Sequence, residues 1–127
     1  MSNRAVISTP AAPEAIGPYS QAIKVGNTVW LSGQIPLVPG TTGLIEGGIA
    51  EQAAQAFRNL AAVAEAAGGC LENAVKINIS LVDLGHFGTV NEVMTTFLRA
   101  PYPARACVQV AALPRGALIE IEAVLSL

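Results

Sequence analysis

The sequence predicts an α+β fold in which two helices cover one face of a mixed β-sheet. Apolar residues alternate with a period of two in several segments and follow a helical period in two others. The predicted elements run ββ-β-α-β-α-β-β, which lacks the regular alternation of a parallel Rossmann sheet. With neither an internal repeat nor a linker, residues 1–127 are expected to form a single domain.

The N-terminal part is predicted to supply three short strands. Residues 5–8 form the first, before Pro10 interrupts the pattern. Residues 20–25 and 28–32 then form a hairpin, because Gly26-Asn27 is a favoured two-residue loop.

The first helix is predicted to start at Ile49, after a glycine- and proline-rich loop at 36–48. It is expected to end at Gly68-Gly69, a usual C-terminal signal. Its polar residues, Gln55 and Asn59 among them, are expected to lie away from the buried face. That apolar face consists of Ile49, Ala53, Ala56, Phe57, Leu60, Ala64 and Ala67.

A strand at 74–82 and a second helix at 87–98 follow. In the strand, Val75 is expected to share the apolar face of the alternating isoleucines, opposite a polar face with Lys76. Asp83 is placed to cap the turn that leads into the helix.

The C-terminal stretch 103–122 is predicted to be an antiparallel hairpin. In the register centred on its turn, Cys107 lies opposite Glu120 and Arg105 opposite Glu122. A cation, a thiol and two carboxylates would then share one surface, which makes this a candidate site. The alternative is a cross-strand ion pair on a solvated face, contributing roughly 0.2–1 kcal/mol.

The charge content predicts association between copies of the chain. Charged residues are 13% of the chain and hydrophobic residues 52%, with a net charge of −2. Weakly charged surfaces favour association, so a homo-oligomer is expected, with the half-polar sheet face as the subunit contact. The basic residues form no stripe with aromatics, so no nucleic-acid partner is expected.

Other site classes lack their sequence signals. No apolar run is long enough for a membrane span and no signal peptide is evident, so a reduced, cytoplasmic protein without a membrane partner is expected. A Gly-rich phosphate loop is absent, and the lone His86 with two isolated cysteines predicts neither a metal site nor a cofactor. Cys107 is more typical of a structural or pocket-lining thiol than of a nucleophile.

Several blocks of the sequence resemble the YjgF/RidA family of reactive-intermediate deaminases, in order and over almost the whole chain. The blocks are IGPYSQA at 16–22, LSGQIP at 31–36, AEAAG at 64–68, VDLGHFGTVNEV at 82–93, PARACVQVAAL at 103–113 and IEI at 119–121. The chain departs from the family in its shorter connection at 98–103, which leaves the preferred imine open.

This resemblance implies a chorismate-mutase-like fold and a homotrimer, in which the sheets form a central barrel and ligand clefts lie between subunits. It also implies hydrolysis of small 2-imino and enamine acids, such as 2-aminoacrylate, 2-iminopropanoate and 2-iminobutanoate, to 2-oxo acids and ammonia. The alternative is a non-catalytic trimer that binds small carboxylates, or acts in regulation or as a chaperone, through the same cleft.

The resemblance also implies roles for residues at matching positions. Arg105 is expected to clamp the substrate carboxylate, for which a planar guanidinium fork is suited. Glu120 is expected to orient or activate water, and Tyr19 to close the pocket and share in proton transfer or substrate contact. Glu122 is expected to be a structural partner of Arg105.

The remaining positions are expected to contact substrate. Ser32 and Gly33 would approach the ligand carboxylate through their main chain, Asn91 would lie near the cleft, and Cys107 would line it. Taken without the resemblance, Tyr19, Ser32-Gly33 and Asn91 are typical of ordinary turn and surface positions.

Overall fold

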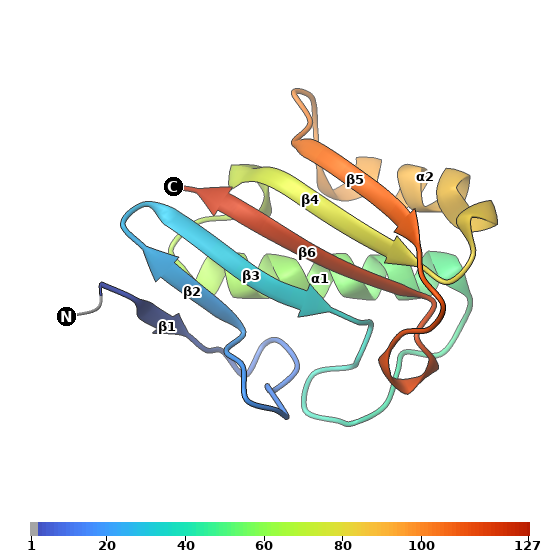
Figure 1. The fold of residues 1–127 in the computed structure, drawn as a ribbon, viewed down its shortest axis with the longest axis horizontal. Coiled ribbons are helices and arrows are strands. Elements are labelled where there is room, and N and C mark those ends of the chain that lie inside the picture. The colour runs from blue at the N-terminus through green and yellow to red at the C-terminus, as the bar shows by residue number, and fades with distance from the viewer. Residues whose placement is uncertain (1–2) are drawn as a thin grey trace.

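The computed structural model describes residues 3–127 as one six-stranded sheet with two α-helices (Figure 1). The strands are β1 (Ala5–Ile7), β2 (Ala22–Val25), β3 (Thr28–Gln34), β4 (Ala74–Leu81), β5 (Ala104–Gln109) and β6 (Ile119–Ser126). The helices are α1 (Ile49–Ala66) and α2 (Phe87–Phe97), with short 3₁₀ turns at Leu71–Asn73, Leu84–His86 and Pro114–Gly116.

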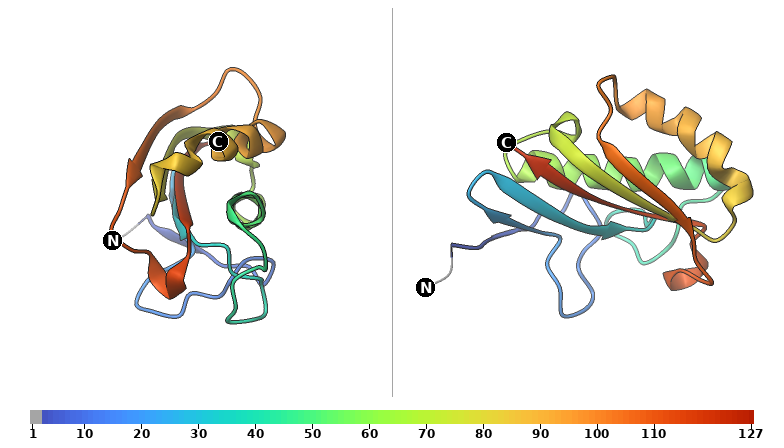
Figure 2. Two further views of the ribbon diagram at one scale, coloured as in Figure 1. Left: turned by 90° about the vertical axis from the view of Figure 1, so that its right-hand side faces the viewer. Right: turned by 45° about the horizontal axis from the view of Figure 1, so that its top comes forward.

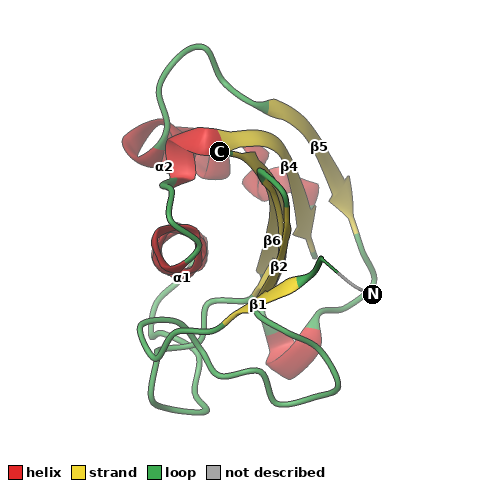
Figure 3. Cartoon of the chain, turned by 90° about the vertical axis from the view of Figure 1, so that its left-hand side faces the viewer, coloured by secondary structure: helices red, strands yellow, loops and turns green. Residues whose placement is uncertain are grey.

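The sheet is mixed, as predicted, and its strand order is β1-β2-β3-β6-β4-β5. Neighbouring strands are antiparallel except β4 and β5, which are parallel. Helix α2 connects that pair, since parallel neighbours need a crossover between them. Both helices lie on the same side of the sheet (Figures 2 and 3), which confirms the predicted layers.

The core lies between the sheet and α1. The predicted apolar face of α1 is buried, and Phe57 stacks on Phe97 of α2 with ring centroids 5.3 Å apart. The sheet contributes alternate, fully buried side chains, as expected when only one face is covered. These include Val29, Ile77, Ile79, Leu81, Ile119, Ile121 and Leu125.

Three side-chain amides of α1 are also buried, so the expectation that its polar residues avoid the packed face was wrong for Gln55 and Asn59. Asn59 Nδ2 donates to the Leu37 carbonyl at 2.9 Å, and Gln55 Nε2 donates to Asn59 Oδ1 at 2.8 Å. Gln52 Oε1 accepts from the Leu118 amide at 2.9 Å. The helix therefore packs against irregular backbone as well as side chains, and that backbone needs polar partners.

The helix ends follow the predicted signals. Gly68, with φ at +94°, adopts the left-handed conformation typical after the last turn of a helix. Asp83 accepts a hydrogen bond from the Gly85 amide at 2.8 Å, which confirms its capping role before α2.

The predicted hairpin between residues 103 and 122 was wrong. Strands β5 and β6 do not pair with each other, because β4 lies between them. The Val110 amide bonds the Leu81 carbonyl and the Val82 amide bonds the Leu118 carbonyl, so the connection over 110–118 passes the end of β4. The turn signals of Pro114 and Gly116 are equally compatible with this longer connection.

The inserted strand also separates the charged residues predicted to share a face. Arg105 and Cys107 align through Ile77 and Ile79 with Ala123 and Ile121, on the helix-covered side. The carboxylates align instead with Asn78 and Ser80 on the open side: Glu122 pairs with Asn78 and Glu120 with Ser80. Within one chain, Arg105 and Glu120 therefore lie on opposite faces of the sheet.

The open face is more apolar than its predicted half-polar pattern. Val6, Trp30 and Val108 are exposed by 67%, 49% and 51% on strands β1, β3 and β5. Val75, expected among the buried isoleucines, is also exposed, because the β4 register shifts between Ala74 and Lys76. Among residues 3–127, neither helix combines the length and the hydropathy needed to cross a membrane.

Candidate active site

Arg105 on β5 lies against helix α2. Its Nη1 donates to Asn91 Oδ1 at 2.6 Å and lies 3.7 Å from the sulfur of Met94. The guanidinium carbon sits 5.0 Å from the centroid of the Phe87 ring, a cation–π distance. Three side chains, spaced at one helical turn on α2, therefore fix the orientation of one guanidinium.

A cavity of about 370 Å³ opens beside this guanidinium. It is lined by Asn91, Met94, Thr95, Tyr102, Pro103 and Arg105. Within the described part of the chain, no carboxylate lies at ion-pair distance from Arg105. The cation Arg99 does form an ion pair, with Glu72 at 2.9 Å. The expectation that Glu122 ties Arg105 down was wrong: Glu122 Oε1 instead accepts from Asn78 Nδ2 at 3.2 Å.

Cys107 lies next to Arg105 on the same side of β5 and is half-buried. Burial raises the pKa of its thiol, and the nearby positive charge of Arg105 offsets only part of that rise. The thiol form is therefore favoured over the nucleophilic thiolate. Cys107 was expected to line the cleft, but it is not among the residues that line the three cavities described in this section.

A second cavity, of about 510 Å³, brings together Tyr19, Ser32, Gly33 and Glu120. Its remaining lining residues are Pro13, Ile16, Gln34, Ile35, Leu37, Pro114, Arg115 and Glu122. Four of the predicted site residues thus meet in this cavity, and Arg105 and Asn91 meet in the other. Among residues 3–127, neither of these two cavities contains both groups.

Backbone contacts join the two segments that carry Tyr19 and Ser32. The Ser32 hydroxyl donates to the Ser20 carbonyl at 2.5 Å, and the Ser32 amide donates to the Gln21 carbonyl at 2.9 Å. The end of β3 and the residue after Tyr19 are therefore held side by side. Both the hydroxyl and the amide of Ser32 are therefore engaged within the subunit.

Glu120 is a partly enclosed carboxyl on β6. Its pKa is raised, first by burial and then by the negative charge of Glu122 two residues along the strand. A carboxylate with a raised pKa is a stronger base than an ordinary one, and its acid form can return the proton it has taken.

Arg115, which was not among the predicted site residues, also lines the Glu120 cavity. This residue has φ at +58° in the turn after β5, and its Nη1 donates to the Thr42 carbonyl at 3.2 Å. It therefore joins the glycine-rich loop to the rim of the Glu120 cavity. The Pro114-Arg115-Gly116 run was interpreted only as turn chemistry, and local sequence holds no signal for a contact so distant along the chain.

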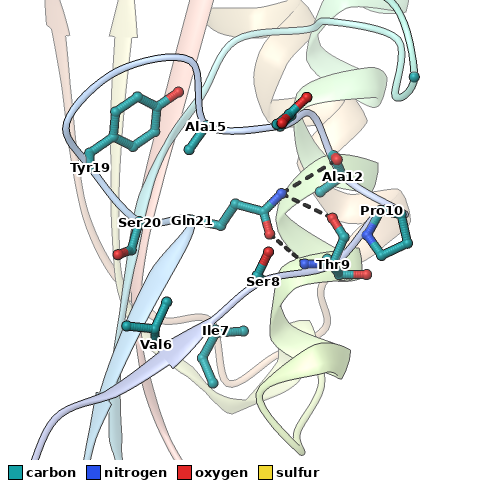
Figure 4. Close-up of a pocket in the computed structure, with 12 residues that line it drawn as sticks. Val6, Ile7, Ser8, Thr9, Pro10, Ala12, Ala15, Tyr19, Ser20 and Gln21 are labelled. Atoms are coloured by element: carbon teal, nitrogen blue, oxygen red, sulfur yellow. Dashed lines mark hydrogen bonds between the residues drawn. The ribbon is translucent and has the colours of Figure 1, made fainter.

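A third cavity, of about 550 Å³, lies on the other side of Tyr19 (Figure 4). The buried Gln21 amide dominates it: Oε1 accepts from the Thr9 amide, and Nε2 donates to the carbonyls of Thr9, Ala12 and Pro13. Every polar atom of that amide is engaged in holding the segment 9–13, which indicates a structural role.

His86 forms the turn before α2, as predicted, and lines none of the three cavities. Across residues 3–127, no three side chains of His, Cys, Asp or Glu converge as ligands for a metal ion.

Known proteins share both the sequence and the fold. A family model described as Endoribonuclease L-PSP matches residues 9–126. The mouse protein named 2-iminobutanoate/2-iminopropanoate deaminase is 51% identical over 121 residues, which cover 95% of this chain and 90% of the mouse protein. The human protein of the same name is 50% identical over 121 residues, covering 95% of this chain and 88% of the human protein.

Solved structures agree with this relationship. The crystal structure of RidA from an Antarctic Psychrobacter bacterium is 54% identical, with a TM-score of 0.94, covering 97% of this chain and 99% of that one. Escherichia coli TdcF with bound serine is 40% identical, with a TM-score of 0.90, covering 97% and 98%. From its sequence blocks, its mixed sheet with two helices on one face, and these matches, the chain belongs to the YjgF/RidA family.

Proposed function

We propose that this protein hydrolyses small 2-imino and enamine acids, such as 2-aminoacrylate, 2-iminopropanoate and 2-iminobutanoate, to 2-oxo acids and ammonia. The observation that carries the proposal is the guanidinium of Arg105. It is fixed in a cavity wall by Asn91 and Phe87, and no carboxylate of residues 3–127 pairs with it. Such a guanidinium is suited to bidentate hydrogen bonding with a substrate carboxylate. Relatives named as deaminases of these imines and a relative with bound serine support this choice.

The reaction requires two proton transfers. Water adds to the imine carbon and gives a carbinolamine, whose C–N bond then breaks to release ammonia and leave the carbonyl. Glu120 takes one proton from the attacking water and passes it to the imine nitrogen as the carbinolamine forms. It then takes the carbinolamine hydroxyl proton and passes it to the same nitrogen as the C–N bond breaks, and its raised pKa is suited to this relay. Tyr19, from the same cavity, closes over the substrate and contributes a hydroxyl to this proton transfer. Water is the only co-substrate, and no cofactor is involved.

The complete site forms between subunits of a homotrimer. Arg105 and Asn91 lie on the helix-covered side of the sheet edge, whereas Glu120 and Tyr19 line a cavity on the other side. A second copy that packs on the open face would bring one group of residues to the other. The apolar side chains of that face, Trp30 and Val108 included, are suited to such a contact.

The activity test couples a threonine or serine dehydratase to the purified protein and follows imine decay. We expect faster formation of 2-oxobutanoate or pyruvate with wild type and little acceleration with Arg105→Ala. Equal rates with and without the protein would refute the proposal. Ligand binding without any turnover would favour the non-catalytic alternative.

A complementation test addresses the shared site. Arg105→Ala and Glu120→Ala are each expected to be inactive, and trimers assembled from an equal mixture should regain about one quarter of wild-type activity. Only interfaces that receive Arg105 from one copy and Glu120 from the other are intact in such trimers. Arg105→Ala mixed with the Arg105→Ala/Glu120→Ala double variant serves as the control, because no interface can be restored. Mixed trimers seen by native mass spectrometry without activity would contradict a site between subunits.

The description of the family model names an endoribonuclease, but this chain offers little for RNA cleavage. Its net charge is −2, and its single histidine, His86, does not line the three cavities described above. RNA binding usually requires a basic surface. RNA cleavage that persists through purification and disappears in Glu120→Ala would support that second activity.

A further inference from the structure

Gly33 lies at an irregularity of β3, beside the Glu120 carboxyl. Leu31 pairs with Ala123 and Gln34 pairs with Ile121, so three steps along β3 match two along β6. Such a bulge commonly redirects a strand next to a functional site. The φ angle of Gly33 lies outside the left-handed region, so its backbone conformation does not itself require glycine.

The space beside Gly33 is occupied by the Glu120 side chain. A Cβ at this position would lie 2.8 Å from Glu120 Cδ, 3.0 Å from Cγ and 3.1 Å from Oε2. Distances below 3.0 Å essentially never occur for a real Cβ, so any side chain here would displace the Glu120 carboxyl. The three nearest heavy atoms all belong to the Glu120 side chain.

We propose that Gly33 is a positioning residue for Glu120. Because Gly33 has no side chain, it leaves a space that the Glu120 carboxyl occupies, and this space directs the carboxyl into the cavity. The inference rests on the proposed function insofar as Glu120 handles the attacking water. It differs from the expected main-chain contact of Gly33 with substrate, because the partner here is a side chain of the same subunit. The partial burial of Glu120 agrees with a carboxyl confined by backbone on one side.

The test is Gly33→Ala, measured by imine hydrolysis. We expect kcat to fall about 10- to 100-fold with little change in KM, since misplacement of a catalytic group by about 1 Å has effects of that size. Binding of 2-oxobutanoate, measured by calorimetry, should stay within about threefold of wild type, because Arg105 still holds the carboxylate. Gly48→Ala is the matched control: a Cβ there meets nothing within 4 Å, and full activity is expected.

A double-mutant cycle separates positioning from other effects. If Gly33 acts through Glu120, Gly33→Ala should cost no further activity in the Glu120→Gln background. Losses that multiply in the double variant would show a direct effect on substrate or on the fold, and would overturn the inference. Unchanged kcat in Gly33→Ala would overturn it as well.

The clash between a Cβ at position 33 and the Glu120 side chain can also be tested through protein stability, without an activity assay. Gly33→Ala should lower the unfolding midpoint in urea, and Glu120→Ala should relieve that loss in the double variant, because the colliding atoms are gone. If Gly33→Ala fails to fold, recovery of folding in the double variant supports the inference, and failure of both refutes it. Should wild type prove inactive on imines, the proposed function fails while this stability cycle still decides the contact.

Discussion

Asn59 links the packing of α1 to the wall of the Glu120 cavity. Its side chain is only 1% exposed, and it donates to the carbonyls of Leu37 at 2.9 Å and Ile35 at 3.3 Å while it accepts from Gln55. Both carbonyls belong to residues that line the cavity. We predict that Asn59→Ala destabilises the protein strongly.

The size of the effect follows from the groups left behind. Each lost hydrogen bond contributes about 0.5–1.5 kcal/mol net, and a buried carbonyl left without a donor costs about 1–3 kcal/mol. The 3.3 Å bond is long and contributes least, so the total is about 2–4 kcal/mol. An alanine also leaves the Gln55 amide without its 2.8 Å acceptor.

Urea unfolding at fixed protein concentration measures this loss, because an oligomer's midpoint depends on concentration. The exposed Glu65→Ala on the same helix is the control and should change stability by less than about 0.5 kcal/mol. A loss below about 1 kcal/mol for Asn59→Ala would refute the structural role of this amide. A loss matched by Glu65→Ala would assign the effect to the helix as a whole.

Four further substitutions test the site. Arg105→Lys keeps the charge but loses the planar fork, so KM should rise about tenfold or more while kcat falls less. Asn91→Ala frees the guanidinium and should raise KM in the same direction, without the full loss of Arg105→Ala. Glu122→Gln removes a negative charge that raises the pKa of Glu120, so the acid limb of the pH profile of kcat/KM should move to lower pH. If that limb does not move, Glu120 is not the titrating base. Glu120→Gln should raise the urea midpoint at neutral pH but not at about pH 3, because a raised carboxyl pKa disfavours folding only once the pH exceeds the unfolded value.

Local patterns predicted every helix and strand of the sheet, with ends shifted by a few residues. The alternation in residues 74–82 and the Gly68-Gly69 stop signal depend only on neighbours in sequence. The structure confirms the stop signal, and it confirms the alternation from Ile77 onward but not at Val75. The prediction that β5 pairs with β6 rested on their nearness along the chain, and it was wrong. Nothing in residues 103–122 indicates that β4 lies between the two strands, because strand order depends on contacts across the whole sheet.

The same limit applies to the candidate site. Several of the predicted site residues line the two cavities. The sequence placed Arg105 and Glu120 on one face, however, where the structure separates them. The burial of Asn59 was missed because a polar residue on a helix is usually solvated. The contact of Gly33 with Glu120 joins distant segments, which no local pattern could indicate.

Trp30 is the only tryptophan of the chain and stands half-exposed on the open face of the sheet. Its fluorescence therefore reports on that face without a label. Indole emission shifts to shorter wavelength when water leaves its surroundings, so dilution of an assembled protein should produce a red shift as copies separate. If assembly uses another surface, the emission wavelength will not change with protein concentration. Trp30 is thus an intrinsic fluorescence probe of the subunit contact that a site shared between subunits requires.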